Sequence, residues 1–457
     1  MNYKLIKPII PSYSALEQIL TNRGVPHDKI HGYLNTTDDD VNSFLCFGED
    51  KLKAAAAALI KCINADAEAE VIVDSDCDGF TSSALLINYL YDLFPAWVNN
   101  KLTWFMHTGK QHGLSDFIPK ENTKLIIIPD AGSNDYEYHK KYADKGIDII
   151  ILDHHEAEKV SEDAIVINNQ LSNYPNKEMS GVGVTWQFCN YLDYLLNKTY
   201  ANKYLDLVAL GMIADMMDMR DFETKHLIGL GLNNIRNPYF KGMIAHNQYF
   251  LKDGITPIGI AFSVAPAMNA VTRVGTPQEK VTLFESMLDF RGLELIPSTK
   301  RGCSGQMETR VEQACRNCTN IKKRQTTAID NSLEIIEQII EEIEEYIDGC
   351  NYSPLSKKNI VVNKEEIEEL LRELCMKTPD EIKRYQKILA NKDAILADAQ
   401  AKAESIVNQA NLQLNEMISE QEIMKQAYAQ ANAVVEAATA QAQEILNNAA
   451  ADANEIR

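Results

Sequence analysis

Short apolar runs alternate with longer helical segments between about residues 70 and 169. This alternation is typical of a parallel β-sheet whose strands are joined by crossover helices. The runs are apolar almost throughout, as expected for strands that are covered on both faces. Four runs are predicted as strands: VIVD (71–74), LIIIPD (125–130), DIIILDHH (148–155) and AIVINN (164–169). The pattern therefore predicts an α/β domain.

Helical periodicity dominates the rest of the chain. Residues 181–240 are predicted to be helical, and 255–290 has a mixed pattern. From about residue 391 onward, alanine and other apolar residues recur at spacings of 3, 4 and 4. This period of 11 residues is typical of a straight or slightly right-handed coiled coil. We expect such a tail to form a homo-oligomer, and a single solvated helix or a flexible tail is the alternative.

These patterns predict three regions. Residues 1–240 would hold the α/β domain, 241–350 a helical extension with a linker helix, and 351–457 the helical coiled-coil tail. A chain of 457 residues is long enough for two or three domains.

Cysteine usage and hydropathy indicate the compartment. The nine cysteines are odd in number and follow no framework spacing, as expected for reduced thiols. The pair Cys315 and Cys318 favours ordinary thiols over a zinc site, because no histidine follows it. No run of about 18 apolar residues occurs, so no membrane helix is expected. We predict a soluble, cytoplasmic protein.

The net charge of −20 at first argues against a nucleic-acid partner. The charge is unevenly distributed, however. Residues 334–348 contain seven acids and no base, and 391–457 contain ten acids and four bases. The segment 300–324 is basic instead. Because local charge decides where a polyanion can bind, a nucleic-acid substrate remains possible.

Polar residues follow the first predicted strand. Asp74, Asp76 and Asp78 alternate in DSDCDG, where their carboxylates would converge and repel one another unless a cation lay between them. Ser82 and Ser83 come just after, at the predicted start of a helix. Backbone N–H groups and hydroxyls in that position can hold a phosphate.

Further candidates follow the next strands. Asp130 ends LIIIPD, the triplet Asp153, His154 and His155 ends DIIILD, and Asp215 lies in a predicted helix. Each residue has an ordinary alternative, such as a helix cap, a surface histidine or a salt bridge. Together they would gather at the edge of the sheet where ligands bind. Carboxylate and imidazole ligands without thiolate favour Mn²⁺ or Mg²⁺.

These motifs resemble those of the DHH phosphoesterases, a family named for the triplet at 153–155. The resemblance covers roughly residues 40–340 and is closest to RecJ-type single-stranded-DNA exonucleases. The segment 266–273, PAMNAVTR, is similar to the P-x-I-N-A-x-G-R element of that group, although Thr272 stands where glycine is usual. Asn320 and Arg324 are similar to the start of the long helix that follows.

The resemblance implies two divalent ions, Mn²⁺ or Mg²⁺, and hydrolysis of single-stranded DNA in repair or recombination. Asp130 would bridge the ions, and Asp74 and His155 would complete or orient the site as catalytic residues. The implied metal ligands are Asp76, Asp78, Asp130, Asp153, His154 and Asp215. Asn269, Arg273 and Arg324 would join Ser82 and Ser83 in binding the substrate.

Two departures leave alternatives open. The chain contains no Gly-Gly pair, so it lacks the GGGH motif of the C-terminal domain of RecJ-type enzymes. From about residue 334 it instead resembles coiled-coil division factors or ATPase stalks. One alternative is a DHH hydrolase of oligoribonucleotides or cyclic dinucleotides, and another is an inactive scaffold. The presence of every expected metal ligand argues against the scaffold.

Overall fold

The computed structural model describes residues 10, 12–109, 111–252, 254–303 and 305–324, with a few isolated residues beyond. The chain divides into two compact units, Met1–Ala328 and Ile329–Arg457. The predicted coiled-coil tail at 351–457 lies almost wholly outside the described residues, so it stays a prediction. The boundary predicted at residue 240 also stays a prediction.

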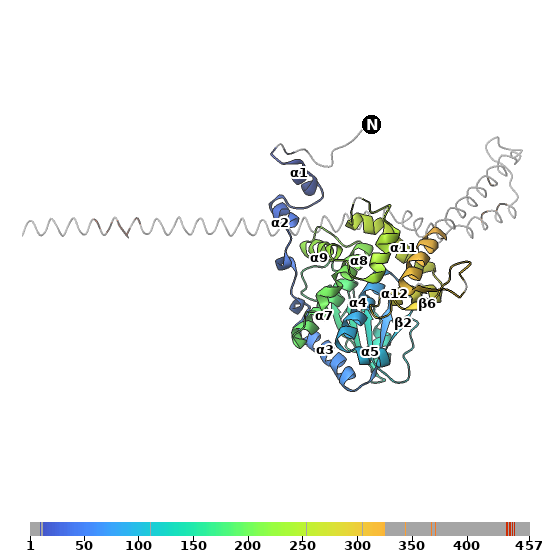
Figure 1. Cartoon of the computed structure of the whole chain (residues 1–457). Helices are drawn as coiled ribbons and strands as arrows, with labels where there is room; N and C mark the ends of the chain where they lie inside the picture. The colour runs from blue at the N-terminus through green and yellow to red at the C-terminus, as the bar shows by residue number, and fades with distance from the viewer. Residues whose placement is uncertain are drawn as a thin grey trace, which may run out of the picture. The chain divides into compact units, whose positions relative to one another are not determined.

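A five-stranded parallel sheet forms the centre of the first unit (Figure 1). Its strands are β1 (Glu68–Val73), β2 (Leu102–Met106), β3 (Thr123–Pro129), β4 (Asp148–Asp153) and β5 (Ile165–Asn168), in the order β2-β1-β3-β4-β5. The predicted α/β class and all four predicted strands are confirmed. The sequence pattern missed β2, a short strand at the edge of the sheet.

The two faces of the sheet are covered by different helices. Val71 and Val73 of β1 belong to one buried cluster together with side chains of α3 (Glu49–Asn64), α4 (Cys77–Leu93) and α7 (Gly181–Leu196). Ile72 points to the other face and shares a second cluster with Tyr142 of α6 (Tyr136–Ala143). Because both faces are buried, the strands are apolar at successive positions.

A group of helices follows the sheet in sequence and gathers at one end of it in Figure 1. It comprises α8 (Leu205–Ala214), α9 (Phe222–Asn233), α10 (Pro238–His246), α11 (Pro257–Val274) and α12 (Pro277–Ser286), and residues 310–324 are also helical. The region with the mixed pattern is therefore mainly helical. Thr256 and Thr276 cap α11 and α12, and a proline occupies the first turn of each.

The remaining elements are small. They are α1 (Ala15–Asn22), α2 (Ile30–Leu34), α5 (Pro95–Lys101) and the antiparallel pair β6 (Leu295–Pro297) and β7 (Met307–Thr309). Within the described ranges, no helix has the length and apolar character needed to cross a membrane.

The close packing of α8 against α9 gives a test of the fold. A Cβ on Gly231 would lie 2.1 Å from the carbonyl oxygen of Leu205, whereas a Cβ on Gly229 would meet nothing within 4 Å. We expect Gly231→Ala to lower the free energy of unfolding by about 1–3 kcal/mol through overpacking. Gly229→Ala, in the same helix, should raise it by up to about 1 kcal/mol through helix propensity. Urea unfolding of both variants checks this, and equal effects would contradict the packing.

Candidate metal centre

The order of the strands explains where the site lies. The chain passes from β1 to β2 on one side and then to β3 on the other side of β1. Such a reversal leaves a crevice at the carboxyl ends of the two central strands, where ligands of open α/β sheets bind. Asp74, Asp76 and Asp78 follow β1, and Asp130 follows β3. The reversal therefore places these four carboxylates around one crevice.

Hydrogen bonding between β3 and β4 brings the third motif beside them. Pro129 pairs with Leu152, and the backbone N–H of Asp130 donates to the carbonyl oxygen of Leu152 at 2.7 Å. His154 follows β4 directly. Its Nε2 atom lies 3.3 Å from Oδ1 of Asp130 and 3.5 Å from Oδ2 of Asp215. The structure thus brings together the predicted residues of all four motifs.

Several sets of these side chains could hold a metal ion, because their ligand atoms lie within 4.8 Å of one another. The sets are Asp130 with His154 and His155, Asp78 with His154 and Asp215, and Asp74 with Asp76 and Asp130. Asp130 and His154 each belong to two sets, so they lie at the centre of the cluster.

The cluster is electrostatically unfavourable without a cation. Asp130 is only 1% exposed, and its Oδ1 atom makes no hydrogen bond. Burial, followed by the charges of Asp78 and Asp76, raises the pKa of Asp130 well above its ordinary value. Burial likewise raises the pKa of Asp78 and of Asp215 to about 6. A buried carboxylate oxygen without a hydrogen-bond donor lacks a favourable interaction that a divalent cation can supply, so these residues fit a metal.

The start of α7 stabilises one carboxylate of the cluster. Asp78 accepts hydrogen bonds from the backbone N–H of Gly181 at 2.7 Å and of Val182 at 3.2 Å. The hydroxyl of Ser180 donates to it at 3.3 Å. A helix N-terminus favours negative charge, because its first N–H groups have no partner within the helix. No sequence motif marks this role of residues 180–182.

Two glycines allow helices to approach the carboxylates. A Cβ on Gly181 of α7 would lie 2.1 Å from Oδ1 of Asp130. A Cβ on Gly211 of α8 would lie 2.4 Å from Oδ1 of Asp78. Any larger residue at either position would displace a predicted ligand.

Asp130 also has an unusual backbone conformation. Its φ of 68° falls in the left-handed region, which costs a residue other than glycine roughly 1–2 kcal/mol. Met216, next to Asp215, has a φ of 59°. Such conformations persist where the surroundings hold them, often at functional sites.

Asp153 is held by hydrogen bonds from its surroundings. Its Oδ2 accepts from the backbone N–H of Ser133 at 2.9 Å, and its Oδ1 accepts from Nδ1 of His155 at 2.8 Å and from the N–H of His154 at 2.7 Å. Burial opposes ionisation, but the hydrogen bonds from His155 and Ser133 outweigh it and lower the pKa of Asp153 to about 2. Both oxygens of Asp153 are thus engaged, and it is in none of the sets that could hold a metal, so its role as a ligand stays a prediction. Its contact with Nδ1 orients the imidazole of His155.

His155 lies at the open edge of the cluster, with its side chain 57% exposed. The hydrogen bond with Asp153 raises the pKa of His155 to about 9, against the opposing effect of burial. In the metal-free fold, the imidazole is therefore held by Nδ1 and its protonated form is favoured at neutral pH.

The loop after β2 holds Asp74 in place. This role of the loop was not predicted from the sequence. Nδ1 of His112 donates to Oδ2 of Asp74 at 2.7 Å, and the N–H of Gly113 donates to Oδ1 at 3.2 Å. Buried Lys280 of α12 anchors this loop, because its Nζ donates to the carbonyl oxygens of His107 at 3.3 Å and Thr108 at 3.2 Å. No sequence motif marks contacts between residues so far apart in the chain.

Two of the predicted substrate-binding residues lie inside the fold. Ser82 and Ser83 are fully buried, and because α4 begins at Cys77, neither lies in its first turn. The hydroxyl of Ser82 donates to the carbonyl oxygen of Asp78 at 2.6 Å. Asp76 caps the helix instead and accepts from the N–H of Gly79 at 3.0 Å.

The other three predicted substrate-binding residues, Asn269, Arg273 and Arg324, lie at different places relative to the cluster. Oδ1 of Asn269 accepts from the backbone N–H of Cys77 at 3.1 Å, which joins α11 to the start of α4 beside the cluster. Arg273 is exposed on α11. Nη2 of Arg324 donates to Oε1 of Glu279 at 3.0 Å, so Arg324 is paired with α12 and makes no described contact with the cluster.

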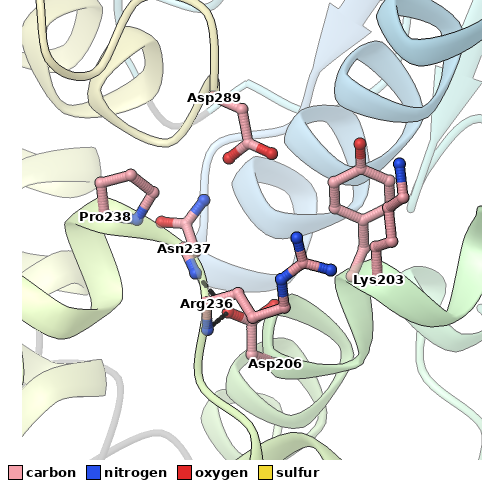
Figure 2. Close-up of a pocket in the computed structure, with 7 residues that line it drawn as sticks. Lys203, Asp206, Arg236, Asn237, Pro238 and Asp289 are labelled. Carbon is pink, nitrogen blue, oxygen red and sulfur yellow. Dashed lines mark hydrogen bonds between the residues drawn. The ribbon is translucent and has the colours of Figure 1, made fainter.

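A polar cavity of about 190 Å³ lies at the other end of α8 (Figure 2). Asp206 there accepts from the backbone N–H groups of Arg236 at 2.8 Å and Asn237 at 2.6 Å. Asp289 lines the same cavity, and burial raises its pKa to about 6. Asp206 and Asp215 stand at opposite ends of α8, roughly 14 Å apart along its axis. This cavity is therefore separate from the metal centre.

A known protein family matches the part of the chain that contains most of the metal-site candidates. Residues 70–212 match the model described as the DHH family, N-terminal domain. This segment contains most of β1, all of β2 to β5, and all the candidate residues of the cluster except Asp215. The chain therefore carries a DHH-family domain, as the resemblance of its motifs predicted.

The relatives found by sequence identify the branch of the family. The chain is 37% identical over 349 residues to YorK, a protein of the SPbeta prophage of Bacillus subtilis whose name provisionally describes a single-strand DNA-specific exonuclease. It is 30% identical over 274 residues to the single-stranded-DNA-specific exonuclease RecJ of Bacillus subtilis. These matches cover 75% and 58% of this chain. The chain is thus homologous to RecJ-like exonucleases.

The chain spans only part of these relatives, 58% of YorK and 33% of RecJ. Among solved structures, it resembles an exonuclease RecJ bound to manganese, with a TM-score of 0.52 and 20% identity over 63% of this chain and 69% of that one. The Mn²⁺ complex of RecJ from Thermus thermophilus gives a TM-score of 0.50 and 20% identity, over 63% of this chain and 40% of that one. These structural matches confirm the fold.

The raised pKa of Asp215 predicts a pH-dependent stability. Because a carboxyl group in the unfolded chain has a pKa of about 4, ionisation destabilises the metal-free fold progressively as the pH rises from about 4 through 6. We expect Asp215→Asn in EDTA to be more stable than the native sequence at neutral pH. The difference should disappear at acidic pH, where Asp215 is neutral in both states. Urea unfolding across this pH range measures the effect.

Asp289→Asn is the matched control, since Asp289 has a similar pKa outside the cluster. Both variants should gain stability in EDTA, but only Asp215→Asn should lose the stabilisation that added Mn²⁺ gives the native chain. Equal stabilisation of both variants by Mn²⁺ would show that Asp215 does not contribute to the metal site.

The contact between His112 and Asp74 generates a second test. His112→Ala removes the donor to Oδ2 of Asp74, so we expect Mn²⁺ affinity to fall by about tenfold, as is usual when a group that orients a ligand is lost. His112→Asn should restore part of the affinity, because its amide can donate to the same oxygen. Titration with Mn²⁺ measures both, and native affinity in the alanine variant would contradict the role.

Proposed function

We propose that this protein hydrolyses phosphodiester bonds in single-stranded DNA with the aid of divalent cations. The observation that carries the proposal is the carboxylate of Asp130, whose buried Oδ1 atom accepts no hydrogen bond, at the centre of a carboxylate–histidine cluster. The relatives are named as exonucleases specific for single-stranded DNA, which supports this choice of substrate.

The arrangement of the cluster supports two ions, Mn²⁺ or Mg²⁺. Asp74 and Asp76 lie with Asp130 in one set, and Asp78 and Asp215 lie with His154 in another. Asp130 and His154 approach each other to 3.3 Å and connect the two sets. When bound, such a pair of cations lowers the pKa of a water molecule and offsets the negative charge of the phosphate. Asp130 would serve as the shared ligand.

The chain's own residues supply positive charge and orientation. His155 is exposed at the edge of the cluster, and the hydrogen bond with Asp153 raises its pKa in the metal-free fold, so a protonated Nε2 there would donate to a phosphate oxygen. Asp153 fixes the orientation of this imidazole through Nδ1. Arg273 is exposed on α11 and could contact a second phosphate. Such contacts position the backbone without reading its sequence.

The cluster itself provides the direct test. Asp130→Asn keeps the shape of the side chain but removes the charge, so we expect Mn²⁺ binding to weaken strongly and hydrolysis of end-labelled single-stranded DNA to fall by about a hundredfold or more. Asp289→Asn is the control, because it removes a carboxylate with a raised pKa outside the cluster and should leave hydrolysis unchanged.

A parallel assay with a dinucleotide and a cyclic dinucleotide tests the substrate. Faster hydrolysis of either one than of single-stranded DNA would assign the site to small nucleotides instead. Full activity of Asp130→Asn would remove the metal centre from the mechanism.

A further inference from the structure

Large apolar side chains are exposed together at the start of α11 and in the loop before it. Tyr249 is 81% exposed, Phe250 72% and Phe262 76%. Ile255 and Ile258 are exposed in the same segment. We call these five residues the aromatic surface. Exposed aromatic side chains gathered in this way usually mark an interaction site.

The parts of this surface lie close together in space. Leu251 is buried, and a Cβ on Gly259 would lie 2.6 Å from its Cδ2 atom, so the loop packs directly on the first turn of α11. The rings of Tyr249 and Phe250 meet edge to face, with their centroids 5.6 Å apart. Figure 1 shows α11 at the end of the unit where the helices gather.

Lysines occur in the segments that form and flank this surface. Nζ of Lys322 donates to the carbonyl oxygen of Phe262 at 3.4 Å, which places the helical segment 310–324 alongside α11. Lys323 follows it and is exposed, and Lys252 is exposed in the loop. Aromatic rings combined with cations are the means by which proteins bind single strands without regard to sequence.

One side of α11 connects this surface with the metal centre. Phe262, Pro266, Asn269 and Arg273 are spaced by 4, 3 and 4 residues and are wholly or partly accessible, while most residues between them are buried. This spacing places them on the same side of a helix. Asn269 contacts Cys77 at the cluster, and Phe262 lies roughly 10 Å from it along the helix axis.

We propose that single-stranded DNA lies along this side of α11, with its bases stacked on Phe262 and on Tyr249 and Phe250. The metal centre would receive one end of the strand, and the aromatic surface would hold bases a few nucleotides away. The placement of one end of the DNA at the metal centre rests on the proposed function. The stacking contacts themselves rest on the exposed rings, the neighbouring lysines and the continuity of α11 with the cluster.

Binding without hydrolysis gives the test. The affinity of the full chain for a fluorescent oligodeoxythymidylate of about 12 nucleotides is measured by anisotropy in EDTA. We expect Phe262→Ala to weaken binding by about tenfold, and the double variant Tyr249→Ala/Phe250→Ala to do the same. Tyr194→Ala is the matched control: Tyr194 is 70% exposed on α7, away from this surface, and should leave the affinity unchanged.

A strand of the same length without bases separates stacking from charge. The native chain and Phe262→Ala should bind this abasic strand equally, because it offers phosphates but nothing to stack. Equal affinity of the native chain and both aromatic variants for the normal strand would overturn the proposal. A change in sedimentation of these variants with unchanged DNA affinity would also overturn it and assign the surface to contact with protein.

The two proposals can fail separately. If the native chain binds DNA through Phe262 but does not hydrolyse it with Mn²⁺, the proposed function fails and the surface stands. If all variants hydrolyse DNA and bind it equally, the proposed role of the aromatic surface is wrong and the proposed function is supported.

Discussion

Repulsion between buried carboxylates is the constraint on which the rest of this structure depends. Asp74, Asp76, Asp78 and Asp130 surround one crevice, and the Oδ1 atom of Asp130 is buried without a donor. Collecting these charges destabilises the metal-free fold, because each charged carboxylate loses water and gains like-charged neighbours. A site that destabilises its own fold until a cation binds is suited to holding metal. Much of the surrounding architecture compensates for this charge.

The compensation comes mainly from backbone groups. The start of α7 donates to Asp78, and the loop after β2 supplies donors to both oxygens of Asp74. Gly181 and Gly211 let two helices approach closely enough to hold these contacts. A Cβ at either glycine would clash with the carboxylate of Asp130 or Asp78, so neither position accepts a larger residue without a shift in the site.

Two helices that follow the sheet in sequence, α11 and α12, contact the residues around the site. Lys280 of α12 anchors the loop that holds Asp74, and Asn269 joins α11 to the start of α4. Both helices lie beyond the segment that matches the DHH family model, which ends at residue 212. The family domain therefore supplies all the candidate ligands except Asp215. The helices that follow it position Asp74 and carry the surface proposed for the strand.

The sequence alone determined the parallel sheet and the strand ends that carry Asp74, Asp130 and His154, because apolar runs and their polar ends are local patterns. It also predicted that these residues would meet, since parallel strands end at one edge. Only the tertiary structure decided the rest. It turned Asp153 toward the histidines and buried Ser82 and Ser83. His112 and Lys280 had no local signal either, because their roles depend on contacts between residues far apart in the chain, and such contacts form only when the whole domain packs.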